Sequence, residues 1–212
     1  MALIDILTSV ALAAASTVTA SISPTETAAP AFRPFGVAQD SLPSALGCKP
    51  IYGDGADTTG QYACSRLPGG SDLYDQYVLA YVQGMGICNV VAVSRYINDD
   101  QRGTTTRQVY KEAASLLASE FGPADEKVDH AASSKYGKDG MFRDAVVAQE
   151  RQVFEQWDNL SAKYKNAQSA SVTISGSDEL GLAVYSIFRF AHNDQCLSTL
   201  QEQTGLSGDQ GD

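Results

Sequence analysis

The feature that most constrains the fold is a pair of strand-like segments on either side of a glycine turn. In residues 77–83 the larger side chains of Tyr77, Leu79 and Tyr81 alternate with those of Val78, Ala80 and Val82. A repeat of two residues is the period of a β-strand. Gly84-Met85-Gly86 predicts a turn, and residues 87–96 predict the returning strand. Ile87, Val91 and Val93 are expected on one face of this strand, and Cys88, Val90 and Ala92 on the other. Because both faces are apolar, it should lie in the centre of an antiparallel sheet.

Further strand signals lie on both sides of this pair. Two short strands are expected at 48–52 and 61–67, joined by a turn-rich segment. A late hairpin is expected from 169–175 to 182–190, around the turn GSDELG. Its core candidates are Val172, Ile174, Val184, Ile187 and Phe188. The polar segment 125–140 is interpreted as a loop.

Four segments predict helices. A short one is expected at Ser41–Leu46, and a longer one runs from Thr104 or Thr105 to the stop at Gly122-Pro123. A second long helix is expected over 142–164, with Trp157 on its apolar stripe. The last helix is capped by Asn193 and stops at Gly205. Strands and helices in separate runs indicate an α+β fold: an antiparallel sheet of about five to six strands, packed by two longer helices and a short C-terminal helix.

The expected organisation places one domain behind an exported leader. Residues 1–20 are an apolar, signal-like or anchoring segment, 21–32 a Pro/Thr/Ala spacer, 33–205 a single α+β domain and 206–212 a disordered tail. Cleavage is expected after Ala20. Asp5 stands where a leader carries a basic residue, so either the start codon lies upstream or the segment is retained as an arm or weak anchor. The predicted location is periplasmic or extracellular, with membrane contact only through residues 1–20.

The charge balance argues against two classes of partner. The 212 residues include 25 acidic and 15 basic side chains, for a formal charge of −10. Binding of nucleic acid or of an anionic membrane surface requires a basic patch, and the sequence contains no basic run. No nucleic acid partner is therefore expected. A protein partner is expected on other grounds, namely the predicted export, the disulfides, a half-open sheet and the absence of catalytic motifs.

The four cysteines, Cys48, Cys64, Cys88 and Cys196, predict disulfide bonds. None lies in a CxxC pair, so the spacing is wrong for structural zinc. Four cysteines allow three pairings. Their placement on neighbouring short strands, and on the central strand and last helix, favours Cys48–Cys64 and Cys88–Cys196. The alternatives are buried thiols or, less favoured, a nucleophilic thiol served by His130 or His192.

No familiar catalytic motif occurs, and no cofactor or metal is expected. Tyr74, Tyr77 and Tyr81 follow a near two-residue period and are candidates for an interaction face, although tyrosines also cover the open side of an ordinary sheet. A hydrolase would need His192, Asp194 and acidic turn residues to converge in a cleft. Those turn residues are Asp54, Asp57, Asp99 and Asp100.

Several short motifs together resemble a scattered family of uncharacterised exported bacterial proteins. They are PFGVAQDSLPSALG, GMGICNVVAVSRYIND, the helix end SEFGP, the tryptophan segment, and LAVYSIFRF followed by a cysteine. The family's usual Tyr-Gly helix end is Phe121-Gly122 here. The resemblance covers 34–196 and implies an envelope protein of unknown role in which Cys88 and Cys196 pair. It carries no activity.

Two functions follow as hypotheses. The favoured one is a non-enzymatic exported interaction module, such as an accessory subunit of an envelope or other larger assembly. The alternative is a secreted hydrolase with an acidic active site. A pocket with strongly perturbed carboxylates would favour the enzyme, and a flat apolar face would favour the module.

Overall fold

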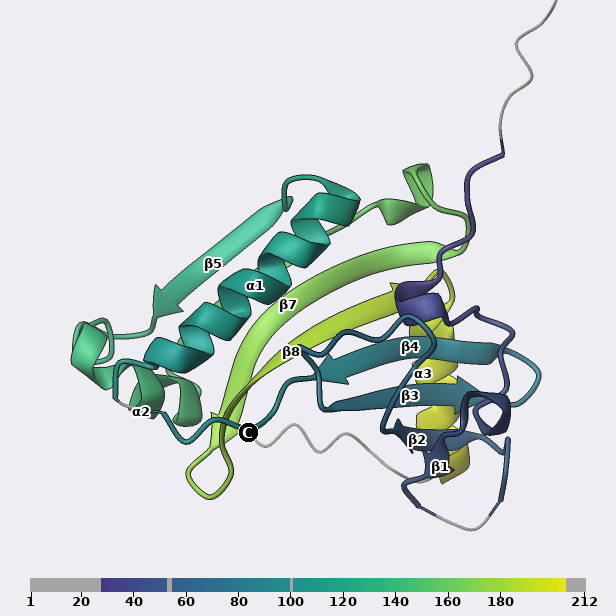
Figure 1. Ribbon diagram of the computed structural model, residues 1–212, viewed down its shortest axis with the longest axis horizontal. Helices are drawn as coiled ribbons and strands as arrows, with labels where there is room; N and C mark the ends of the chain where they lie inside the picture. Colours follow the sequence, from purple (N-terminus) through teal and green to yellow (C-terminus); the bar gives the residue numbers. More distant parts are fainter. Residues whose placement is uncertain (1–27, 53–54, 100, 205–212) are drawn as a thin grey trace, which may run out of the picture.

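The computed structural model describes residues 28–52, 55–99 and 101–204, which form one eight-stranded antiparallel sheet with helices on both faces (Figure 1). The strands are β1 (Lys49–Pro50), β2 (Gly60–Cys64), β3 (Gln76–Val82), β4 (Gly86–Val93), β5 (Glu126–Ala131), β6 (Arg151–Trp157), β7 (Ala167–Ser177) and β8 (Gly181–Phe190). The α-helices are α1 (Thr104–Phe121), α2 (Phe142–Val147) and α3 (Asn193–Thr204), and the 3-10 turns are η1 (Pro34–Gly36), η2 (Ser44–Leu46), η3 (Asp139–Met141) and η4 (Leu160–Ala162). The expected leader 1–20, residues 21–27 of the spacer and the tail 206–212 lie outside the described residues.

The strand order is β1-β2-β3-β4-β8-β7-β6-β5. Each half of the chain therefore makes a four-stranded meander of sequence neighbours, and the two meanders join where β4 pairs with β8. The junction runs from Asn89 opposite Arg189 to Val93 opposite Tyr185. The helix α1 lies in the connection between the two meanders.

The predicted α+β fold with five or six strands is wrong. The described residues are mostly β, with eight strands. Of the two longer helices expected, only α1 forms, and α2 has six residues. Two segments account for the difference. One is expected to be helical and the other to be a loop, and both are strands in the structure.

The first of these is β6. The expected helix over 142–164 ends at Val147, and the chain turns at Gln149, whose φ is 58°. Val153 and Trp157 then lie buried on one side of the strand. Residues four apart share a face in both a helix and a strand, so these two apolar positions fit both periods.

The second is β5, which was expected to be a loop. It pairs with β6 from Glu126 opposite Gln156 to Ala131 opposite Arg151. It is the last strand of the sheet, and its six residues are exposed or half-buried. An edge strand needs no apolar alternation, and charged side chains there hinder pairing with another chain. The polar sequence of β5 therefore gave no signal that would predict a strand.

A β-bulge changes the expected faces of β4. The register shifts between Ala80 and Tyr81, which pair with Asn89 and Ile87, so Cys88 has no partner opposite it. A bulge adds one residue, so it reverses the alternation beyond it. Ile87 consequently shares the main core with Val90 and Ala92 instead of with Val91 and Val93.

Two cores of unequal size cover the two faces of the sheet. The larger core packs α1, α2 and the segment after Ala31 against one face, with Trp157, Phe142, Tyr77, Leu79 and Phe190 among its most buried side chains. The smaller core packs α3 against β3 and β4 on the other face, through Ala80, Val82, Cys88, Cys196 and Leu200. Figure 1 shows α1 beside β5 and β7, and α3 behind β3 and β4.

The four cysteines form two disulfides, and the expectation of disulfide bonds is confirmed. Cys48–Cys64 links the start of β1 to the end of β2, across 16 positions in the sequence. Cys88–Cys196 links β4 to α3 across 108 positions. These are the two pairs that the placement of the cysteines favoured. The second bond fastens the last helix to the central strands.

Candidate functional site

The face of the sheet that carries α3 is only partly covered. Among the described helices, α3 alone packs on this face, over β3 and β4. Beyond it, a row of cross-strand neighbours runs from Val78 through Val91 to Ile187, and a second row includes Tyr185 and Phe154. All five side chains are half-buried. We call these five residues the open strip.

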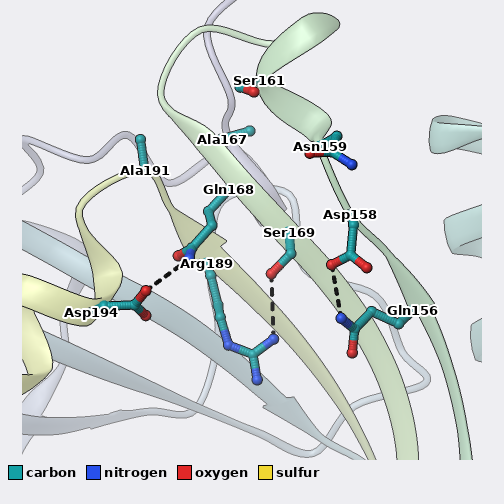
Figure 2. A pocket seen from close by; sticks show the side chains of 10 residues that line it. All are labelled: Gln156, Asp158, Asn159, Ser161, Ala167, Gln168, Ser169, Arg189, Ala191 and Asp194. Atoms are coloured by element: carbon teal, nitrogen blue, oxygen red, sulfur yellow. Dashed lines mark hydrogen bonds between the residues drawn. The ribbon is translucent and has the colours of Figure 1, made fainter. Parts of the chain in front are cut away.

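A polar hollow of about 710 Å³ lies at the end of the open strip (Figure 2). Its lining comes from the end of β6 and η4, the paired ends of β7 and β8, and the start of α3. The lining residues are Gln156, Asp158, Asn159, Ser161, Ala167, Gln168, Ser169, Arg189, Ala191 and Asp194. Arg189 lies on the same side of β8 as Ile187, two residues away, so strip and hollow form one continuous face.

The polar side chains in the hollow form hydrogen bonds with one another, among them one from Gln156 Nε2 to Asp158 Oδ1 at 2.8 Å. Gln168 Nε2 donates to Asp194 Oδ2 at 3.1 Å, and Arg189 Nη1 donates to Ser169 Oγ at 3.5 Å. Figure 2 shows the Arg189 guanidinium below Ser169, between the chains of β7 and α3. Gln168 Oε1 is buried and has no hydrogen-bond partner among the described residues. The hollow thus presents a guanidinium, two carboxylates and several amides.

This arrangement is suited to hydrogen bonding across an interface. Donors and acceptors alternate over a short distance, which lets the hollow receive backbone or side-chain polar groups of a partner. Within the described ranges, no group of three or more His, Cys, Asp or Glu side chains is placed to hold a metal ion.

The three tyrosines named as a candidate interaction face are in the main core. Tyr74, Tyr77 and Tyr81 are 6%, 2% and 5% exposed. Burial raises the pKa of Tyr74 to about 12, against the opposing effect of its hydrogen bond with Ser186, 2.6 Å away. Tyr77 accepts the Ser71 N–H at 2.9 Å. These tyrosines therefore form no exposed face, because the side of β3 on which they lie packs against the main core under α1.

The residues named for a hydrolase are separate. Asp194 lines the hollow, whereas the His192 ring lies 2.9 Å from Gln39 Nε2, and burial lowers the pKa of His192. Asp57 accepts the Ser44 N–H, and Asp99 accepts the Thr106 N–H at the start of α1. Asp54 and Asp100 lie outside the described residues. His130, the other candidate base, lies on the edge strand β5.

The open strip and the hollow were not predicted from the sequence. Their residues come from strands that are far apart in the chain, and the bulge puts Ile87 on the opposite face from Val91, with which it was expected to lie. The alternation of serine and threonine with alanine, valine and isoleucine in β7 did signal one polar face. The pairing of β4 with β8 was needed to bring that face together with the open strip.

Comparisons of the chain with protein-family models, curated proteins and solved structures found no match. The fold and the site are those of a disulfide-linked antiparallel β-sheet protein with a partly open face. Within the part of the chain that the structure describes, no helix is long and apolar enough to cross a bilayer.

Proposed function

We propose that this protein is an exported, non-enzymatic interaction module that binds a protein partner through the open strip and the polar hollow. The observation that carries the proposal is the composition of the open strip. Valine, isoleucine, tyrosine and phenylalanine lie side by side on the part of the sheet face that α3 leaves uncovered. A contiguous apolar patch bordered by polar groups is typical of a protein interface.

Side chains at the two ends of the open strip also support binding of a protein partner. Tyr96 is 40% exposed and its hydroxyl lies 3.0 Å from that of Tyr185, which adds an amphipathic aromatic side chain at one end of the strip. At the other end, Arg189 supplies a guanidinium. Tyrosine and arginine are enriched among the residues that contribute most to interface affinity.

Export is supported by the chemistry of the cysteines. Disulfides persist in oxidising compartments and are rare in reducing ones. Both bonds of this protein are intact and their cysteines are buried. The exported location therefore rests on the disulfides together with the signal-like sequence of residues 1–20.

The test is site-specific photo-crosslinking in the producing cells. A photoreactive phenylalanine analogue replaces Ile187 in one variant and Glu112, which is exposed on α1, in the other. We expect the Ile187 variant to give one adduct of defined mass, and the Glu112 variant to give none. Intact mass of the uncrosslinked chain reports in parallel whether it is cleaved near Ala20 and whether all four cysteines are oxidised.

Substitution at the hollow separates specific binding from simple adhesion. Arg189→Met should lower the yield of the adduct formed from position 187. Arg33→Met, at an exposed site that lines none of the described pockets, should leave that yield unchanged. If positions 187 and 112 give the same adducts, or if neither gives one, the open strip is not a partner-binding surface.

A further inference from the structure

A second cavity lies on the opposite face of the sheet, between α1 and the edge strands. Its volume is about 460 Å³, which lies within the range of about 300–1,000 Å³ usual for small-molecule sites. Figure 1 shows α1 lying along β5 with α2 at one end of the pair. The lining residues include Arg107, Tyr110, Lys111, Lys127, Asp129, Phe142, Val153, Glu155 and Ile174.

The floor of this cavity is apolar. Phe142, Val153, Ile174 and Tyr110 are between 0% and 9% exposed and belong to the main core. Burial raises the pKa of the Tyr110 phenol, with a smaller contribution from the Glu155 carboxylate, so its hydroxyl stays protonated and can donate a hydrogen bond. An apolar chain or ring placed here would leave water and contact these side chains.

The rim of the same cavity is basic. Lys127 pairs with Glu155 at 2.8 Å, and Arg151 pairs with Asp129 at 2.6 Å. Arg107 and Lys111 add two more cations, four residues apart on α1 and therefore on one side of the helix. The cavity and its border thus hold four cations and two carboxylates, in a chain whose formal charge is −10.

The cations are also held in place above the floor. The Arg107 guanidinium carbon lies 4.1 Å from the centre of the Phe142 ring, and that of Arg151 lies 5.0 Å from it. Stacking of this kind orients a guanidinium and leaves its positive charge available to a ligand. The Arg151 side chain is 10% exposed, and its Nη1 is buried without a hydrogen-bond partner among the described residues.

From this combination we propose that the α1–β5 cavity binds an amphipathic carboxylate, with its acyl chain or aromatic body on the apolar floor and its carboxylate at the Arg107–Lys111 rim. An inorganic anion would leave the floor unused. A cationic amphiphile would place like charges together at the rim, which is unfavourable. The proposal is independent of the interaction function assigned to the other face of the sheet.

Three ligands with the same twelve-carbon chain and different head groups test the proposal. Laurate, dodecanol and dodecyltrimethylammonium are titrated into the intact, oxidised protein below their micelle concentrations, and binding is followed by calorimetry. Laurate should bind at least about tenfold more tightly than either of the others. Its affinity should fall as sodium chloride increases, since the rim cations Lys111 and Lys127 are exposed to solvent.

Charge reversal at the rim locates the site. Lys111→Glu should lower the affinity for laurate at least about fivefold, because Lys111 is exposed on α1 and its replacement removes a rim cation. Lys49→Glu makes the same charge change on β1, at the opposite edge of the sheet, and should leave the affinity unchanged. Circular dichroism checks that both variants remain folded.

Three outcomes would overturn the proposal. The first is no binding of laurate. The second is equal binding of the three head groups, which would indicate general adhesion to apolar surface. The third is laurate binding that Lys111→Glu and Lys49→Glu affect equally, which would place the ligand elsewhere or reduce the effect to net charge.

Discussion

At the scale of single residues, the β3–β4 turn contains two glycines with similar positive φ angles and different surroundings. Gly84 and Gly86 have φ values of 86° and 90°. A Cβ at Gly84 would have no atom within 4 Å, whereas one at Gly86 would overlap the Gln39 carbonyl oxygen. That oxygen accepts the Ile87 N–H at 2.7 Å, so it cannot move away without losing a hydrogen bond.

We therefore predict different costs for two alanine substitutions. Gly84→Ala carries only the backbone cost of a positive φ, about 1–2 kcal/mol of unfolding free energy. Gly86→Ala adds a steric clash with backbone and should cost about 1–3 kcal/mol more. Urea denaturation of both variants measures the difference. Equal losses would mean that the segment around Gln39 shifts freely.

His192 gives a second prediction at this scale, on the pH dependence of stability. Burial lowers the pKa of His192 in the folded protein, so the unfolded chain binds the proton more readily. Stability should therefore fall as pH drops below the ordinary histidine pKa of about 6.5. Protonation would also remove the ring acceptor for Gln39 Nε2.

The matched variant is His192→Asn, which keeps a side-chain acceptor near Gln39 and does not titrate. The unfolding free energy of the natural protein relative to this variant should decrease between pH 7.5 and pH 5.5. A constant difference over that interval would show that burial of the ring does not affect its titration.

At the scale of secondary-structure elements, the sequence predicted those whose periodicity has one interpretation. The hairpin of β7 and β8 lies where the alternation placed it, and α1 lies where the helical period and the Gly122-Pro123 stop placed it. The N-cap of α1 is Gly103, however, and neither Thr104 nor Thr105 caps the helix. β6 was missed because Val153 and Trp157 satisfy both a helical and a strand period. β5 was missed because an edge strand carries no such signal. The candidate site was missed because it depends on register, which local patterns do not specify.

The two disulfides differ in the length of chain that they close. Removing Cys88–Cys196, as Cys88→Ala with Cys196→Ala, should cost about 4–5 kcal/mol in the chain-entropy model, against about 3 kcal/mol for Cys48–Cys64. All four cysteines are at most 8% exposed, so the alanine substitutions themselves are comparable. Urea denaturation of the two double variants tests the order. A larger loss from the shorter loop would contradict it.

At the scale of the whole molecule, acidic charge opposes the compact state. With 25 acidic and 15 basic residues, self-repulsion is greatest at low ionic strength. We expect the thermal midpoint of unfolding to rise between about 10 and 200 mM sodium chloride, as the Debye length falls from about 30 Å to under 10 Å. The ion pairs that Lys127, Arg143 and Arg151 form with carboxylates are at least partly exposed and should weaken only slightly.

Scanning calorimetry at pH 7 gives this midpoint directly, with potassium chloride as a control for ion-specific effects. A midpoint that falls as salt increases would show that the exposed ion pairs outweigh the general repulsion.

The pairing of β4 with β8 also has a consequence for the order of folding. Within each meander, neighbouring strands are close in sequence, so their ladders close short loops and can form early. The β4–β8 ladder joins residues 92 to 100 positions apart, from Val93–Tyr185 to Asn89–Arg189. Its closure is therefore the slow, long-range event, and the two halves of the chain become one cooperative unit only when that ladder forms.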